Sequence, residues 1–298
     1  MLTDEIRRRA AWVARRARHV RVRVDAIERY AATLPEVAPP ATDLEGAGEE
    51  RRAAFLLELN AINFGSGWFP TLRKRPGMSG FRTVEAGLRG HGPWSAAELA
   101  AIDRAQIASA LGQDPAHELI GLYARHLREL GARVRDEAGG SFLAFARSGD
   151  GSAVALAERL ATWPTWQDVS PYDGARVPFF KRAQIAAADL ALTGLAPAAD
   201  LPQLTLFADN LVPHVLRLDG VLEFEAQLVA RIDAGELLER DAPEEVEIRA
   251  CALHAVELLV AAHPRGTTAT AVDNALWHRG AGARYKARPR HRARTTAY

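Results

Sequence analysis

Apolar residues recur every three to four positions through most of this 298-residue chain, and this spacing constrains its fold more than any other feature. Such spacing puts apolar side chains on one face of an α-helix. No sustained two-residue alternation and no Asn-Gly turn occurs, so a large β-sheet is not expected. The sequence therefore predicts a mainly α-helical protein, with clear helical patterns in residues 3–30, 50–64, 152–163 and from residue 243 onward.

Local signals predict where other segments begin and end. Ser95 and Glu98 have the spacing of a capping box, before a helix that is expected to extend to residue 111. Residues 114–115, Asp-Pro, predict the start of a helix that Gly131 closes. Pro178 is expected to open a helix that ends near residue 192.

Breaks in the helical pattern are also legible. Residues 34–48 are rich in Pro, Ala and Gly, and residues 65–94 contain seven Gly and three Pro, so both segments are predicted to be loops. The helix over residues 3–30 is expected to break near residues 20–24, where β-branched residues alternate with Arg.

Charge is distributed unevenly although the whole chain carries a net charge of only +1. Residues 1–30 carry +5, residues 279–298 carry +7, and the segment between them carries −11. From charge alone, a solvated N-terminal helix and a frayed C-terminal tail are the simplest interpretation, although an anion site or a nucleic-acid surface is also possible. With no composition break, we expect one helical domain over 1–298, with a basic helix and loop at 1–50 and a basic tail at 279–298.

Several classes of protein are excluded by what the sequence lacks. No uncharged apolar run is long enough to span a membrane, and no secretory signal is present, so a cytoplasmic location is expected. A single Cys251 excludes an internal disulfide framework. Without phosphate-binding, dinucleotide-binding or zinc-binding motifs, we expect neither a metal nor another cofactor.

Two polar residues in apolar surroundings are candidates for chemistry. Asp209 has apolar neighbours on both sides and precedes Pro213, which is expected to break or bend the local helix. A carboxylate in such a setting suits proton transfer or stabilisation of a cationic transition state, but helix capping explains it equally well. Lys181 is one of only three Lys against 35 Arg. A surface lysine that lays its stem along apolar neighbours explains it without any function.

Other residues have weaker claims to a ligand. Asp168 is most simply a turn or cap residue, and the acids that open the helix after residue 243 complement the helix dipole. Aromatic side chains can stack on a flat ligand, although they more often fill a core. The aromatic candidates are Phe64, Trp68, Phe207, Trp277 and Tyr298.

Taken together, several segments resemble the queuosine salvage family, whose members are queuosine 5′-phosphate N-glycosylases. The matching segments are 60–68 (NAINFGSGW), 170–174 (SPYDG), 179–185 (FFKRAQI), 207–216 (FADNLVPHVL), 245–249 (EVEIR), 272–277 (VDNALW) and 289–298 (PRHRARTTAY). They occur in the expected order from about residue 55 to the end of the sequence. The combination of KRAQI and FAD in one chain is specific. In the first of these segments, Trp68 departs from the shorter, more aromatic stretch typical of the family.

The resemblance implies a helical fold similar to helix-hairpin-helix DNA glycosylases, and hydrolysis of a nucleotide to queuine and ribose 5-phosphate. It implies that Asp209 is the catalytic carboxylate and Lys181 its partner in the active site. It further implies a small-molecule substrate, no metal or redox cofactor, no stable nucleic-acid partner and no membrane. Its remaining implied substrate-binding residues are Asn63, Phe64, Trp68, Asp168, Tyr172, Phe207, Glu247, Arg249, Asp273, Trp277, His291, Arg292, Arg294 and Tyr298.

Specific roles follow from the chemistry of this substrate. The basic residues His291, Arg292 and Arg294 are expected to bind its 5′-phosphate, so that the tail folds over the site. Glu247 and Asp273 are expected to meet the cationic cyclopentenediol arm of queuine. Two other functions stay open: a DNA or RNA base glycosylase, and a non-catalytic nucleotide- or RNA-binding protein in which Asp209 only caps a helix.

Overall fold

The computed structural model describes residues 1–35, 44, 46–149 and 151–298. In this part of the chain helices dominate, and the β-structure consists of three two-stranded sheets, which confirms the prediction of a mainly α-helical protein. None of the helices described here combines the length and apolar content needed to cross a lipid bilayer. The predicted loop at 34–48 lies largely outside the described residues.

The chain forms two compact units, and each unit is assembled from separated segments. The first unit contains residues 1–40, 168–181 and 202–294, and the second contains residues 41–167, 182–201 and 295–298. This division does not test the predicted single domain over 1–298, which stays a prediction. Each unit is described by itself below.

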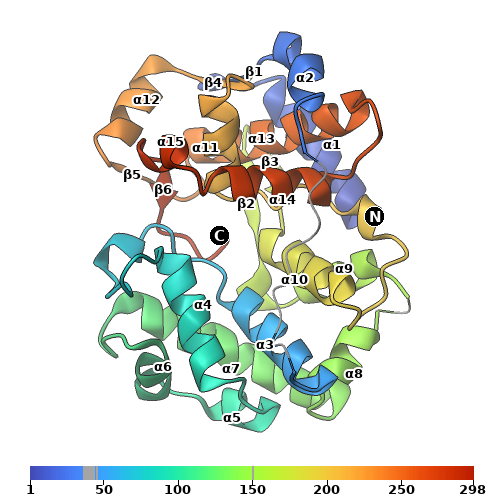
Figure 1. Cartoon of the computed structure of the whole chain (residues 1–298), viewed down its shortest axis with the longest axis vertical. Helices are drawn as coiled ribbons and strands as arrows, with labels where there is room; N and C mark the ends of the chain where they lie inside the picture. Colours follow the sequence, from blue (N-terminus) through green and yellow to red (C-terminus); the bar gives the residue numbers. More distant parts are fainter. Residues whose placement is uncertain (36–43, 45, 150) are drawn as a thin grey trace. The chain divides into compact units, whose positions relative to one another are not determined.

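In the first unit the long helix α13 (Pro243–Ala262) is the centre of the core. It is buried on nearly all sides from Glu245 to Leu253, and it is contacted by four other helices (Figure 1). A helix that is buried around its whole circumference must be surrounded by other elements, and its buried polar side chains need partners there. The surrounding helices are α1 (Leu2–Ala14), α2 (Val24–Ala31), α11 (Leu211–Leu218) and α14 (Ala269–Arg279).

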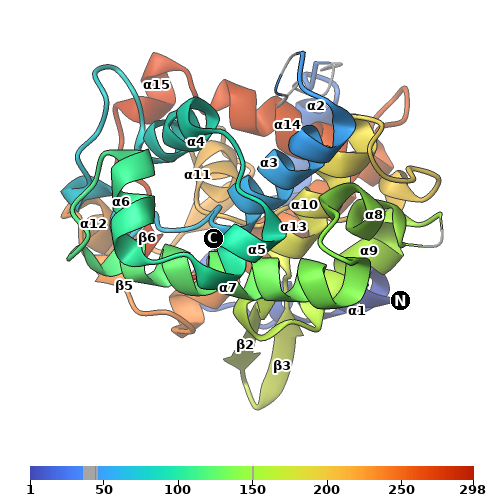
Figure 2. The same cartoon turned by 90° about the horizontal axis from the view of Figure 1, so that it is seen from below.

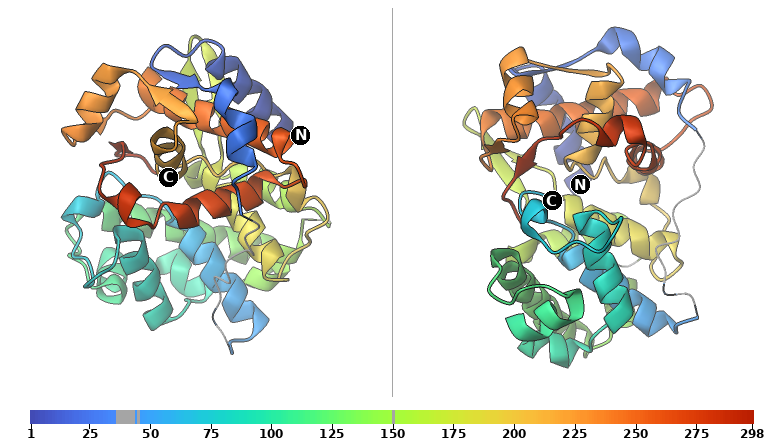
Figure 3. Two further views of the ribbon diagram at one scale, coloured as in Figure 1. Left: turned by 45° about the horizontal axis from the view of Figure 1, so that its top comes forward. Right: turned by 60° about the vertical axis from the view of Figure 1, so that its left-hand side comes forward.

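Short strands complete the first unit. An antiparallel pair joins β1 (Val20–Val22) to β4 (Leu222–Phe224), and a hairpin joins β2 (Val169–Tyr172) to β3 (Ala175–Pro178). A parallel pair joins β5 (Leu237–Leu238) to β6 (Arg292–Ala293) near the C-terminus. The remaining elements are α12 (Ala226–Asp233) and α15 (Ala283–Lys286), seen again in Figure 3. The predicted break near residues 20–24 is confirmed, because β1 separates α1 from α2.

The second unit is built around α7 (Glu118–Ala138). This helix contacts α3 (Glu49–Ala61), α5 (Ala96–Ala101), α6 (Arg104–Leu111) and α8 (Phe142–Arg147), as Figure 2 shows. The unit also contains α4 (Gly80–His91), α9 (Ala153–Ala161), most of α10 (Lys181–Leu192), and the 3-10 turns η1 (Phe69–Thr71) and η2 (Pro164–Trp166). A third 3-10 turn, η3 (Leu201–Gln203), has its first residue in the second unit and its other two residues in the first. The helical predictions for residues 50–64, 152–163 and 243 onward are confirmed.

Two loop and helix predictions in the second unit are wrong. Residues 65–94 contain the helix α4, because the Ser79 side chain caps it by accepting a hydrogen bond from the Arg82 amide. Residues 95–111 form two helices rather than one, because Asp103 and Gln106 form a second capping box that starts α6. The capping box at Ser95, predicted from spacing, is present.

Gly131 does not end a helix, as its residue type suggested, but lies inside α7. A Cβ atom at this position would lie 2.5 Å from the Ala100 amide nitrogen of α5. Glycine is required here because the two helices approach too closely for any side chain. The helix ends instead at Gly139, whose φ of +60° is in the left-handed region.

The start of α10 also differs from the prediction. Pro178 ends β3, where it pairs with Val169, and the helix begins three residues later at Lys181. The intervening Phe180 has a φ of +48°. A bulky residue in the left-handed region costs about 1–2 kcal/mol, so the surrounding structure must hold this turn in place.

Candidate active site

Asp209 lies two residues before the first residue of α11, Leu211, at the end of a buried segment that includes Phe207. Its Oδ1 atom accepts hydrogen bonds from the amides of Leu211 and Val212, at 2.7 and 3.2 Å. The carboxylate therefore caps the helix, while its Oδ2 atom accepts no hydrogen bond from the described residues. Capping therefore uses one of the two carboxylate oxygens of Asp209.

Pro213 does not break the helix beside Asp209. It lies in the first turn of α11, where its missing amide donor removes no intrahelical hydrogen bond. The prediction of a bend at Pro213 is therefore wrong, and this segment is the beginning of a helix.

A buried ion pair organises the segments on either side of the candidate residues. The Arg249 guanidinium binds both oxygens of Asp168, at 2.9 and 2.8 Å, and the two side chains are 1% and 3% exposed. The Arg249 Nε atom also donates to the Ala208 carbonyl at 3.0 Å, directly before Asp209. The Asp168 Oδ2 atom accepts a hydrogen bond from the Lys181 amide at 3.0 Å. One ion pair thus positions both Lys181 and the residue that precedes Asp209.

Further contacts hold the strained turn before Lys181. The Asp168 carbonyl accepts a hydrogen bond from the Phe179 amide at 2.9 Å. The Arg249 guanidinium lies over the Phe179 ring, 4.0 Å from its centroid. Lys181 itself is 5% exposed, so the interpretation of it as a surface cation is wrong. The strain at Phe180 was not visible in the sequence, because no local pattern predicts a positive φ for Phe.

Glu247 and Tyr172 form a second buried cluster in the first unit. The Glu247 Oε2 atom accepts hydrogen bonds from three consecutive amides, those of Arg18, His19 and Val20, at 2.6–3.1 Å. Its Oε1 atom accepts one from the Tyr172 hydroxyl at 2.8 Å. These protein donors account for the complete burial of this carboxylate without any ligand.

Asp273 and Trp277 lie four residues apart on α14, so they share one face of that helix. Asp273 is 8% exposed. Because α14 contacts α11, both residues belong to the same helical layer as the segment that carries Asp209.

The C-terminal basic segment is ordered and packs within the first unit up to Arg294. The His291 carbonyl accepts a hydrogen bond from the Asn210 side-chain amide at 3.0 Å, and His291 is 2% exposed. An Arg292 Nη2 atom donates to the Gly235 carbonyl at 3.2 Å, whereas Arg294 is exposed. The simpler prediction of a frayed tail is therefore wrong, and the chain places His291 beside the residue that follows Asp209.

In the second unit, the predicted residues of the 60–68 segment meet the C-terminus. The main-chain oxygen of Tyr298 accepts a hydrogen bond from the Gly65 amide at 3.1 Å, and both Tyr298 and Phe64 are nearly fully buried. The Trp68 Nε1 atom donates to Glu118 at 2.7 Å, and the Asn63 side chain donates to Asn60 at 3.1 Å.

The Phe64 ring belongs to a buried cluster with Arg182. The Arg182 guanidinium lies 5.2 Å from the Phe64 centroid and 5.0 Å from that of Trp166, and it donates to the Ala61 carbonyl at 2.8 Å. His126 packs against Phe64 with 4.6 Å between ring centroids. Burial, with the nearby Arg182, lowers the pKa of His126 to about 2, so its ring is neutral at pH 7. This cluster explains the Arg that follows Lys181 in the KRAQI segment.

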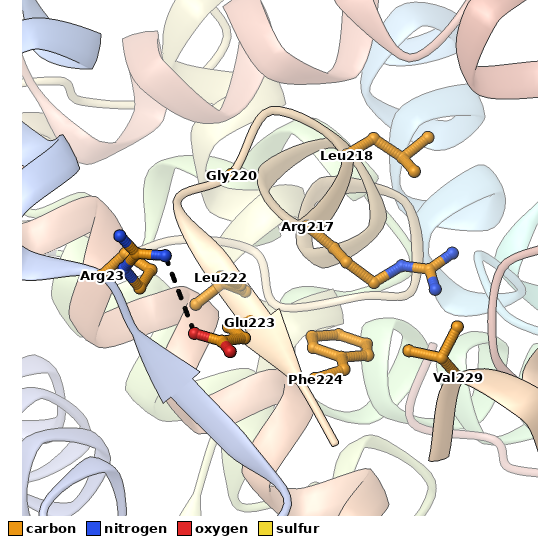
Figure 4. Close-up of a pocket in the computed structure, with 8 residues that line it drawn as sticks. All are labelled: Arg23, Arg217, Leu218, Gly220, Leu222, Glu223, Phe224 and Val229. Carbon is orange, nitrogen blue, oxygen red and sulfur yellow. Dashed lines mark ion pairs between the residues drawn. The ribbon is translucent and has the colours of Figure 1, made fainter. Parts of the chain in front are cut away.

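None of the predicted site residues lines the surface groove found in the first unit. It has a volume of about 280 Å³ and is lined by Arg23, Arg217, Leu218, Gly220, Leu222, Glu223, Phe224 and Val229 (Figure 4). Its charged residues have protein partners, since Arg23 lies 3.8 Å from Glu223 and Arg217 lies over Phe224. Among the described residues, no three His, Cys, Asp or Glu side chains are grouped so that they could hold a metal ion.

Comparison with known proteins agrees with the resemblance seen in the sequence. The family model described as queuosine salvage protein matches residues 46–298. A protein from Sphaerobacter thermophilus, named queuosine 5′-phosphate N-glycosylase/hydrolase, is 33% identical over 96% of this chain and 95% of its own length. A protein of the same name from Dictyostelium discoideum is 33% identical over 58% of this chain and 57% of its own length. Another from Bos taurus is 36% identical over 45% of this chain and 41% of its own length. This chain therefore belongs to the queuosine salvage protein family.

Proposed function

We propose that this protein hydrolyses the N-glycosidic bond of queuosine 5′-phosphate and releases queuine and ribose 5-phosphate. Support comes from the named activity of the Sphaerobacter thermophilus relative, which is matched over almost its whole length. The observation that carries the proposal is the geometry of Asp209, whose Oδ1 atom is held by two amides while its Oδ2 atom accepts no hydrogen bond from the described residues.

The chemistry requires a carboxylate of this kind. Breaking the bond between ribose C1′ and the base develops positive charge on the ribose, in an oxocarbenium-like state. A preorganised carboxylate stabilises that charge, and it orients or deprotonates the attacking water. Because the two amide hydrogen bonds fix the Asp209 carboxylate before the substrate arrives, little reorganisation is needed during the reaction.

Lys181 acts as the partner of Asp209 in this proposal, either by pairing with the carboxylate or by holding a ribose hydroxyl. Asp168 and Arg249 serve as positioning residues, because their ion pair is joined to the Lys181 amide and to the Ala208 carbonyl. A 7-deazapurine has no N7 to accept a proton as it departs. Stabilisation of the ribose cation therefore has to supply more of the rate enhancement.

Recognition of the two ends of the substrate falls to charged residues. The 5′-phosphate is assigned to the basic tail. The cationic arm of queuine requires an acid, and we assign Asp273 ahead of Glu247, because four protein donors already occupy the Glu247 oxygens. Asn63, Phe64, Trp68 and Tyr298 remain predicted contacts of the substrate.

The broader setting follows from the same proposal. We infer a fold similar to helix-hairpin-helix DNA glycosylases, a cytoplasmic location, and a small-molecule substrate without a stable nucleic-acid partner. The chain lacks the Gly-hydrophobic-Gly hairpin that grips a DNA backbone in polynucleotide glycosylases of this type.

The test is incubation of the full chain with queuosine 5′-phosphate, with mass-spectrometric detection of queuine and guanosine 5′-phosphate as the control substrate. In Asp209→Asn the side-chain oxygen still caps α11, so the variant is expected to fold and to bind substrate. We expect its kcat to fall by at least about 100-fold. Asp136→Asn, which changes an exposed aspartate paired with Arg135, is the matched control. Full activity in Asp209→Asn would refute the catalytic assignment.

A further inference from the structure

We propose that Arg290 is the residue that binds the 5′-phosphate, because the chain holds it beside Asp209 without giving it an anionic partner. This inference rests on the proposed function and makes it more specific. The sequence alone assigns this role to His291, Arg292 and Arg294 rather than to Arg290.

The main chain on both sides of Arg290 is anchored. The Pro289 carbonyl accepts a hydrogen bond from the Arg217 guanidinium at 3.2 Å, and the His291 carbonyl accepts one from Asn210 at 3.0 Å. The next two residues form β6, which pairs with β5. A ligand-binding side chain on an anchored segment loses less conformational entropy when it binds, so the position of Arg290 is preorganised.

The surroundings of Arg290 differ from those of the other arginines in this region. Arg249 forms an ion pair with Asp168, and Arg292 donates a hydrogen bond to the Gly235 carbonyl. Arg290 is partly buried and forms neither a hydrogen bond nor an ion pair with the described residues. Burial lowers the pKa of its guanidinium, and the nearby Asp209 carboxylate opposes that effect. A desolvated cation without a counter-ion is costly, and an anionic ligand relieves that cost.

The spatial relation to Asp209 suits a nucleotide. Asn210, which follows Asp209, donates at 3.0 Å to the carbonyl of His291, which follows Arg290, so neighbouring main-chain segments carry the two side chains, and these do not form an ion pair. A direct ion pair would occupy the carboxylate that must face C1′. In the substrate, C1′ and C4′, which carries the 5′-phosphate arm, flank the ring oxygen of the ribose, so one ligand can meet both groups. A guanidinium also matches phosphate oxygens with two parallel hydrogen bonds.

The neighbouring basic residues fit the role less well. Burial, with the Arg249 and Arg290 guanidinium groups close by, lowers the pKa of His291 to about 3, so its ring is neutral at pH 7. Arg292 already donates to a main-chain carbonyl. Side chains alternate along this extended segment, with His291 and Ala293 buried and the arginines on the more exposed side. His291 is therefore a positioning residue that anchors the segment.

The experiment compares wild-type protein with Arg290→Gln on queuosine 5′-phosphate and on queuosine, its dephosphorylated nucleoside. Loss of a charge-assisted bidentate contact is expected to lower kcat/KM for the phosphorylated substrate by about 10- to 100-fold, with a change of less than about twofold for the nucleoside. Arg288→Gln, an exposed arginine two residues earlier, is the matched control and should behave as wild type. Arg290→Lys keeps the positive charge but loses the paired donors of the guanidinium, so a smaller loss of kcat/KM is expected. This variant replaces Arg290→Gln if the Gln variant does not fold.

Calorimetric titration with ribose 5-phosphate supplies a readout that does not depend on catalysis. The affinity is expected to fall in Arg290→Gln by the same factor as kcat/KM. Unchanged affinity for ribose 5-phosphate overturns the assignment. An equal loss of kcat/KM on both substrates also overturns it, because Arg290 then acts through Asp209 and not through the phosphate. If wild-type protein releases no queuine, the proposed function fails. The titration still decides the role of Arg290. Weaker binding of ribose 5-phosphate by Arg290→Gln than by wild type supports this role. Equal affinity in the two proteins, or no binding by wild type, overturns it.

Discussion

The buried Asp168–Arg249 ion pair allows a sharp test of how the candidate site is held together. The perturbation is Arg249→Met, which keeps an unbranched apolar stem but removes the guanidinium. It eliminates two hydrogen bonds to Asp168, one to the Ala208 carbonyl and the contact with the Phe179 ring. Among the described residues, the buried Asp168 carboxylate then accepts a hydrogen bond only from the Lys181 amide.

The expected magnitude follows from burial rather than from distance. Removing one partner of a buried ion pair costs about 3–5 kcal/mol, because the other charge stays desolvated. The Arg135–Asp136 pair has the same 2.8 Å separation, but its side chains are 56% and 61% exposed. For such an exposed pair the expected loss is about 0–1 kcal/mol, so Arg135→Met is the matched control.

The assay is urea unfolding of the full chain, followed by circular dichroism, for Arg249→Met, Asp168→Asn and the double variant. Arg249→Met leaves the buried Asp168 carboxylate without its cation, and Asp168→Asn leaves the Arg249 guanidinium beside the more distant Glu245 carboxylate, at 3.9 Å, whereas the double variant removes both charges of the pair. The double variant should therefore be more stable than the sum of the single losses predicts, by at least about 2 kcal/mol. Losses that add to within about 0.5 kcal/mol, or a loss below about 1 kcal/mol in Arg249→Met, would show that this pair does not organise the site.

Two further predictions concern the second unit. Gly65 has a φ of +119°, and a Cβ there would lie 2.9 Å from a Leu119 methyl group, so Gly65→Ala should lower the free energy of unfolding by about 1–3 kcal/mol in urea unfolding. His126 has an ordinary pKa of 6.5 that burial lowers to about 2, so it takes up a proton on unfolding at pH values between these two. Stability should therefore fall as the pH drops below about 6.5, and His126→Gln should remove up to about 1.4 kcal/mol per pH unit of that slope. An unchanged slope in His126→Gln, or a changed one in the exposed control His278→Gln, would contradict the explanation.

Signals that act within a few residues were predictable. Apolar periodicity located α3, α9 and α13, and the Ser95 capping box is present as its spacing required. The same local reasoning identified Asp209 as a carboxylate at a helix start. The interpretation of Asp209 as a cap is confirmed and involves Oδ1, whereas its role as a reactive group stays a proposal.

Local reasoning was wrong where packing overrides residue type. Gly131 has the identity of a helix terminator, but the close approach of α5 makes it an interior residue of α7. Residues 65–94 are rich in Gly, yet the Ser79 cap and the apolar face of α4 suffice to form a helix there. Helix propensity is a weak preference of less than about 1 kcal/mol per residue, so burial of one face outweighs it.

The amino-acid order is enough to predict the helical fold class and the family, and the family resemblance implies the candidate pair of Asp209 and Lys181. Only the tertiary structure showed that Asp168 and Arg249, 81 residues apart, form the ion pair that positions both members of that pair. It also showed that the basic tail is anchored at Asn210, and that Arg290 forms neither a hydrogen bond nor an ion pair with the described residues. The physical reason is that helix periodicity and capping depend on neighbours within one or two turns. The partner and the solvation of a charged side chain depend on which distant segments pack against it.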